Sequence, residues 1–140
     1  MKATILYRIA AVVFVLFAVG HTVGFLSFKA PTPEGRAVRE SMDTQRFQVK
    51  GASLSYGGFY TGFGLSATAN LVFSAFLAWH LGTLAAKNPS AIGLLGWAFC
   101  ALQIVGVVLS FVYFSTPPAV LSAAVTLCLG WAAWLVTAAS

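Results

Sequence analysis

Six of the polar side chains within the long apolar stretches of this chain could take part in chemistry. A histidine there can act as an acid, a base or a metal ligand, because its ring exchanges a proton near neutral pH. Hydroxyl and amide groups beside it could orient a ligand. Polar groups are costly inside a membrane, so each is a candidate for function. The six are His21, Thr22, Tyr60, Thr61, Gln103 and Thr126.

The spacing of these groups predicts a polar cluster around His21. With a helical rise of ~1.5 Å per residue, His21 lies ~10 Å from the first-loop end of its stretch, and Tyr60 lies ~6 Å from it. Gln103 and Thr126 lie ~16 Å and ~14 Å from the same side. We expect the His21 ring to bond Tyr60, a threonine hydroxyl or a backbone carbonyl and so to fasten the helices. The alternative is that His21 and Tyr60 orient a bound ligand.

The second histidine, His80, is not expected to join this cluster. It lies ~25 Å farther along the helical direction, which is too far for the two histidines to ligate one haem within one subunit. Beside Trp79, it is predicted to anchor a helix at the membrane interface. Cys100 and Cys128 form no C-x-x-C motif, and no acidic residue lies in an apolar stretch. We therefore predict no metal, no cofactor and no proton-coupled transport.

Four long apolar stretches must position these groups. Of the 140 residues, 59% are hydrophobic and 8% are charged, a composition typical of membrane proteins. A helix needs about 20 apolar residues to cross a bilayer, and the stretches at 5–28, 56–84, 91–114 and 119–139 meet that requirement. Short connections between the later stretches favour antiparallel neighbours. The sequence predicts an all-α integral membrane four-helix bundle, up-down-up-down, as one transmembrane domain over residues 1–140.

The charges fit a membrane location. The first apolar stretch continues past residue 20, longer than the apolar core of a signal peptide, so we expect it to be retained. Eight Lys and Arg residues give a net charge of +5 and flank the stretches, where they can meet lipid headgroups. No basic stripe interleaved with aromatic residues is present, so nucleic acid is not an expected partner. Loop charges slightly favour a cytoplasmic first loop, whereas the basic N-terminus favours the opposite orientation.

The polar first loop, residues 29–55, is predicted to contain a short amphipathic helix. Thr32 can cap its N-terminus, Pro33 suits the first helical position and Glu34 suits the first turn. The predicted helix covers about Pro33–Asp43 and lies across the mouth of the bundle or on the membrane surface. Its apolar stripe is expected to comprise Val38, Met42 and Val49.

Small residues at four-residue spacing predict close helix packing. In lipid, such spacing lets two helix backbones approach each other. The candidate positions are Gly20, Gly24, Gly58, Gly62 and Ser66.

Two motifs resemble those of an uncharacterised family of small bacterial four-helix integral membrane proteins. They are G-H-T-x-G at 20–24 and F-Y-x-G-F-G at 59–64. The resemblance extends over nearly the whole chain and implies the same fold and the bacterial inner (cytoplasmic) membrane, but no mechanism. The positions that look like the family's signature are His21, Thr22, Phe59, Tyr60, Gly62 and Gly64.

Three functional hypotheses remain. In the first, the chain binds a lipid or other apolar small molecule in a cavity under the first loop, with His21 and Tyr60 orienting its polar end. In the second, it is an accessory or structural subunit that packs against itself or a larger membrane complex. The third, an intramembrane isomerase using His21 as acid or base, or a transporter, ranks last because no carboxylate is embedded. The expected partners are membrane lipids, a second copy of the chain or a larger complex.

Overall fold

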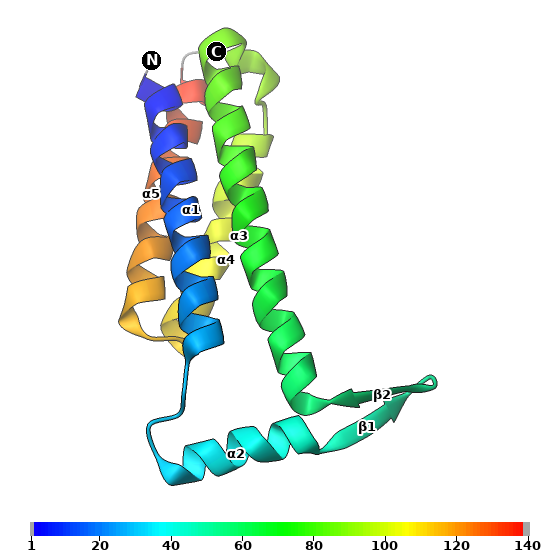
Figure 1. Cartoon of the computed structure of the whole chain (residues 1–140). Helices are drawn as coiled ribbons and strands as arrows, with labels where there is room; N and C mark the ends of the chain where they lie inside the picture. Colours follow the sequence, from blue (N-terminus) through cyan, green and yellow to red (C-terminus); the bar gives the residue numbers. More distant parts are fainter. Residues whose placement is uncertain (1, 139–140) are drawn as a thin grey trace. The chain divides into compact units, whose positions relative to one another are not determined.

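The computed structural model describes residues 2–138, and 83% of these residues are helical. Four long apolar helices are present, as predicted (Figure 1). They are α1 (Lys2–Ser27), α3 (Tyr56–Lys87), α4 (Leu95–Tyr113) and α5 (Thr116–Thr137). Helix α4 begins later than the predicted stretch at 91–114. The reason is that Pro89–Ala91 form a single 3-10 turn, η1, and Gly93 follows with a φ of 50°. Residue 139, the end of the fourth predicted stretch, lies outside the described residues.

The chain divides into two compact units, and α1 and α3 contribute to both. The first unit runs from the N-terminus to Phe17 and from Leu71 onward. The second unit is Ala18–Asn70. The first contains α4 and α5, and the second contains all of the polar first loop.

The buried core lies in the first unit and draws on all four long helices. Phe14 of α1 stacks on Phe99 of α4, with ring centroids 5.8 Å apart. Gly82 of α3 lies so close to α1 that a Cβ there would be 3.3 Å from the carbonyl oxygen of Thr4. Small residues therefore allow the helices to approach closely at this point. The largest fully buried side chains are Tyr7, Phe14, Leu81, Val125 and Leu129.

A buried hydroxyl pair joins α4 to α5, which lie side by side (Figure 1). The Oγ atoms of Ser110 and Ser122 are 3.2 Å apart, and both side chains are buried. Hydrogen bonds of this kind between helices in lipid contribute ~0.6 kcal/mol on average. We expect Ser110→Ala and Ser122→Ala to lower the free energy of unfolding by less in combination than the sum of their separate effects, with a coupling of about 0.6 kcal/mol. A double-mutant cycle measured by unfolding in mixed micelles would check this, and strictly additive effects would contradict it.

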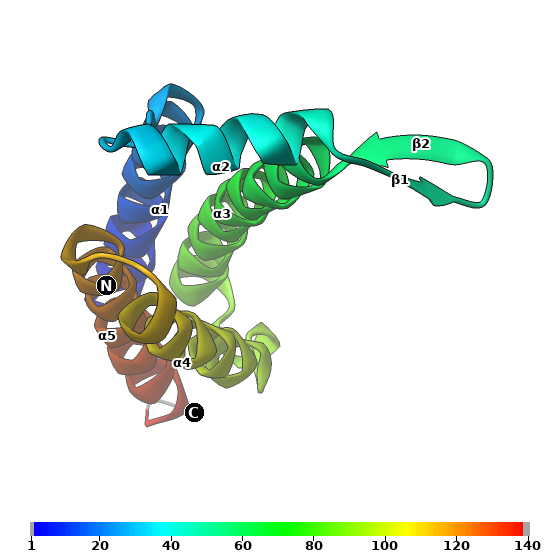
Figure 2. The ribbon, with the colours of Figure 1, turned by 90° about the horizontal axis from the view of Figure 1, so that it is seen from below.

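The predicted short helix is confirmed as α2, Pro33–Thr44. The Thr32 hydroxyl accepts a hydrogen bond from the amide of Gly35 at 3.1 Å, as expected for an N-cap. Figure 2 shows α2 running from the C-terminal end of α1 toward the start of α3. The predicted apolar stripe is wrong at Val49, because the helix ends at Thr44 and Val49 belongs to a strand.

A two-stranded hairpin between α2 and α3 was not predicted from the sequence. Strand β1 (Arg46–Val49) pairs antiparallel with β2 (Ala52–Ser55). Lys50 and Gly51 connect the strands with φ values of 46° and 87°, the left-handed pair that a two-residue type I′ turn requires. The Phe47 ring packs on Tyr56, with centroids 4.7 Å apart. This contact attaches the hairpin to the first turn of α3.

Candidate ligand-binding site

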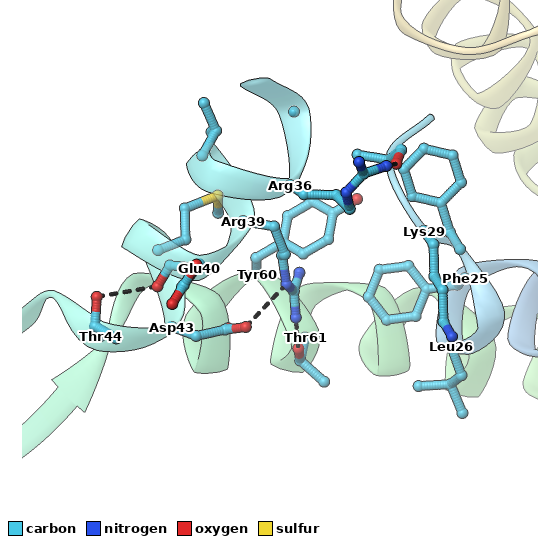
Figure 3. Close-up of a pocket in the computed structure, with 15 residues that line it drawn as sticks. Phe25, Leu26, Lys29, Arg36, Arg39, Glu40, Asp43, Thr44, Tyr60 and Thr61 are labelled. Carbon is cyan, nitrogen blue, oxygen red and sulfur yellow. Dashed lines mark hydrogen bonds and ion pairs between the residues drawn. The ribbon is translucent and has the colours of Figure 1, made fainter. Parts of the chain in front are cut away.

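A pocket of about 640 Å³ lies in the second unit, beneath α2 (Figure 3). It is lined by the C-terminal end of α1, the following linker, α2 and the first turns of α3. The sequence analysis expected a cavity under the first loop, and residues 29–44 of that loop contribute to the lining of this pocket. Its apolar side chains are Phe25, Leu26, Phe28, Val38 and Met42. Its charged side chains are Lys29, Arg36, Arg39, Glu40 and Asp43.

Arg39 connects α2 to α3 at one side of the pocket. Its Nε donates to Asp43 Oδ2 at 3.3 Å, and its Nη2 donates to the Thr61 hydroxyl at 3.5 Å. The guanidinium carbon also lies 5.4 Å from the centroid of the Tyr60 ring, within cation–π range. Figure 3 shows these groups converging on the Arg39 side chain. The contacts to Thr61 and Tyr60 join α2 to the first turns of α3, whereas the Asp43 contact lies within α2.

Arg36 is held differently, by backbone alone. Its Nη1 donates to the carbonyl oxygens of Ala30 and Pro31, each at 3.3 Å. Neither Arg36 nor Lys29 forms an ion pair with any carboxylate of residues 2–138. The pocket lining therefore includes two cations, Arg36 and Lys29, that form no ion pair among the described residues.

His21 lies behind the pocket and does not line it. Its Nε2 donates to the backbone carbonyl of Gly64 at 3.0 Å, a backbone acceptor being one of the three kinds expected. The imidazole stacks on Phe25 with centroids 5.7 Å apart and planes at 10°. Phe25 in turn packs on Tyr60 at 5.4 Å. His21 therefore supports the pocket wall through Phe25, whereas Tyr60 and Thr61 line the pocket directly.

Thr22 adds a second connection between α1 and α3. Its hydroxyl donates to the carbonyl of Ala18 at 2.7 Å and lies 2.9 Å from the hydroxyl of Thr68. The Thr68 hydroxyl also lies 3.5 Å from the carbonyl of Gly64, to which it can donate its proton. Sequence reasoning did not single out Thr68. Its position, four residues after Gly64 and so on the same helix face, is the signal that could have found it.

Gln103 and Thr126 belong to the first unit, whereas His21 and Tyr60 belong to the second. Thr126 donates its hydroxyl proton to the carbonyl of Ser122 at 2.8 Å, within its own helix. The carbonyl of Thr126 accepts a weak hydrogen bond from the Cys100 thiol at 3.9 Å. Both contacts are local to α4 and α5.

Most of the positions predicted for close helix packing have free space beside them in the described structure. A Cβ added at Gly20, Gly24 or Gly62 would meet nothing within 4 Å. Ser66 is exposed, and its hydroxyl donates to the carbonyl of Gly62 at 2.9 Å. Gly58, Gly62 and Ser66 line a shallower groove of about 390 Å³ beside β2. Their role in packing against another chain stays a prediction.

A substitution at the N-cap of α2 tests whether Thr32 stabilises the first turn of this helix, which lines the pocket. Thr32→Ala removes the hydroxyl that accepts from Gly35 and is expected to destabilise the first turn of α2 by about 1 kcal/mol. Amide hydrogen exchange in that turn should accelerate about fivefold, while exchange in α5 stays unchanged. Thr32→Ser retains the cap and should restore slow exchange. Equal exchange in the alanine variant and the native protein would contradict this role for Thr32.

No known protein family, curated protein or solved structure matches the chain. Within the described part of the chain, no three His, Cys, Asp or Glu side chains lie close enough together to hold a metal ion. The pocket must therefore be interpreted from the chemistry of its own lining.

Proposed function

We propose that this chain is a multi-pass protein of the bacterial inner membrane that binds a lipid or other apolar small molecule in the pocket beneath α2. In this proposal, α1, α3, α4 and α5 cross the bilayer as an up-down-up-down bundle. The four helices are 26, 32, 19 and 22 residues long and apolar enough to do so. Large apolar side chains on them are exposed, Leu127 by 73% and Phe111 by 67%, which suits contact with acyl chains.

The pocket is the observation that carries the proposed function. Its volume of about 640 Å³ lies within the range of small-molecule sites, ~300–1,000 Å³. The apolar side chains from α1 and α2 suit a hydrocarbon group, and the few polar groups can orient a head group. Tyr60 and Thr61 take the contact roles, and His21 takes a positioning role through Phe25. Membership of the family that the two motifs resemble is part of the same proposal.

Filling the pocket tests the proposal. Met42→Trp places a larger side chain in the apolar lining and is expected to abolish retention of a small molecule during gentle purification. Native mass spectrometry of the protein released from detergent micelles would measure the retained mass. Val49→Trp on the hairpin adds the same side chain outside the pocket lining and serves as the matched control. Retention of the same mass by the Met42→Trp variant would rule out this pocket as the binding site.

A second set of variants distinguishes a residue that contacts the ligand from a residue that only positions the pocket wall. Tyr60→Phe retains the ring that packs on Phe25 and removes only the hydroxyl group. His21→Ala removes both the Gly64 hydrogen bond and the stack on Phe25, so it should weaken ligand retention and lower thermal stability together. If His21→Ala lowers thermal stability and leaves retention unchanged, then His21 fastens α1 to α3 and has no part in binding.

A second candidate function is association with a second copy of the chain or with a larger membrane complex. The exposed groove formed by Gly58, Gly62 and Ser66 favours this candidate, since small residues at this spacing permit close helix approach. Gly62→Leu would fill the groove. A shift from oligomer to monomer in native mass spectra would support this candidate, whereas a protein that is monomeric both with and without the substitution would argue against self-association.

A further inference from the structure

We propose further that the ligand of this pocket is an amphiphile with an anionic head group, a phosphate or a carboxylate, which Arg36 and Lys29 bind. This inference rests on the proposed binding function and names the class of ligand. The charges of the lining carry it. Three cations and two carboxylates line the pocket, and one cation, Arg39, is already paired with one carboxylate, Asp43.

Among the lining side chains that form no ion pair in the described part of the chain, positive charges outnumber negative charges. After the Arg39–Asp43 pair is set aside, two cations, Arg36 and Lys29, and one carboxylate, that of Glu40, remain in the lining, so its net charge is +1. A neutral ligand would leave this positive charge uncompensated. An anionic head group would compensate it, and charge-assisted hydrogen bonds are the stronger class.

Arg36 is prepared for this role by its backbone contacts. A guanidinium group has five N–H donors, and the hydrogen bonds of Arg36 to Ala30 and Pro31 both use Nη1. These contacts hold the side chain in place, and Nε and Nη2 keep donors for a ligand. The fork of donors matches the oxygen geometry of phosphate and carboxylate. Because the group is already held, binding requires little further ordering of its side chain.

Lys29 is the second lining cation that forms no ion pair with a described residue. It lies in the linker after α1, whereas Arg36 lies in the first turn of α2, so the two charges come from different parts of the lining (Figure 3). The lysine is exposed and can act as a mobile point charge on a head group. Phe25, Phe28 and Met42 offer apolar contacts for the hydrocarbon part.

Matched lipids test the inference. Oleoyl lysophosphatidic acid and monooleoylglycerol carry the same acyl chain and differ in the phosphate. Binding to the full chain in neutral detergent would be titrated by native mass spectrometry, with inorganic phosphate as a third probe. We expect the native protein to bind the lysophosphatidic acid at least about tenfold more tightly than monooleoylglycerol, as one or more charge-assisted hydrogen bonds would give.

Variants assign that preference to residues. Arg36→Gln and Lys29→Gln should each shift the preference toward equal affinity for the two lipids. A circular dichroism spectrum like that of the native protein would verify that each variant is folded. Arg36→Lys retains the charge without the fork and should recover part of the preference. Lys50→Gln removes one charge at the hairpin turn, outside the pocket, and should have no effect.

The outcomes distinguish the two proposals. Equal affinity for both lipids in the native protein would overturn the anionic inference and leave the binding function standing. Binding of neither lipid would overturn the binding function and the inference with it. An equal loss of preference in Lys50→Gln would overturn the assignment to Arg36 and Lys29. If inorganic phosphate binds as tightly as the lysophosphatidic acid, the pocket binds anions, but the proposal that its ligand is an amphiphile is overturned.

Discussion

Gly64→Ala is expected to lower the free energy of unfolding of the protein by about 1–3 kcal/mol, a typical cost of overpacking. A Cβ at this position would overlap the ring of Phe25. The ring cannot move freely, because it lies between the imidazole of His21 and the ring of Tyr60. Its displacement would therefore break both ring contacts and the wall of the pocket. Ligand affinity should fall in the same variant.

Gly62→Ala is the matched control, and the expected effect has the opposite sign. Gly62 lies two residues earlier in the same helix, and a Cβ there would meet nothing within 4 Å. Alanine in an unhindered helix interior is more stable than glycine by ~0.5–1 kcal/mol. Unfolding in mixed micelles, followed by circular dichroism, would measure both variants. If the two substitutions change stability equally, then the contact with Phe25 is not the reason that position 64 needs glycine.

Phe14→Ala is expected to have the largest effect on stability, a loss of about 3–5 kcal/mol. Phe14 is 1% exposed and stacks on Phe99, so truncation leaves a cavity between α1 and α4. In lipid or detergent, this loss arises from packing contacts rather than from exposure to water. Phe111→Ala, at a side chain that is 67% exposed, should change stability by less than ~0.5 kcal/mol. Similar losses at the two phenylalanines, measured by the same unfolding assay, would contradict this account.

The helices and the cap of α2 could be predicted because local signals determine them. Apolar length predicted the four long helices, and Thr32 followed by Pro33 correctly marked the start of α2. The hairpin was missed because its strands are only four residues long each. Its available signal was the Lys50–Gly51 pair between two short segments, one with Phe47 and Val49 and the other with Leu54.

The site was only partly predictable, since depth along a helix does not specify which side of the helix a residue occupies. Depth placed His21 near Tyr60, and the structure connects them through Phe25, a residue that the sequence analysis did not single out. The role of Gly64 as an acceptor depends on a backbone carbonyl, which sequence patterns do not reveal. Likewise, Arg36 and Arg39 share one segment, but only their three-dimensional contacts separate the paired cation from the unpaired one.

The division of the chain at Phe17 and Leu71 determines what intrinsic fluorescence can report. All four tryptophans, at positions 79, 97, 131 and 134, belong to the first unit. Emission excited at the red edge of the absorption band will therefore report on the first unit. The second unit, with the pocket, has tyrosines and no tryptophan. The Val49→Trp variant would accordingly place a tryptophan in the second unit, and the difference between its emission and that of the native protein would report on that unit.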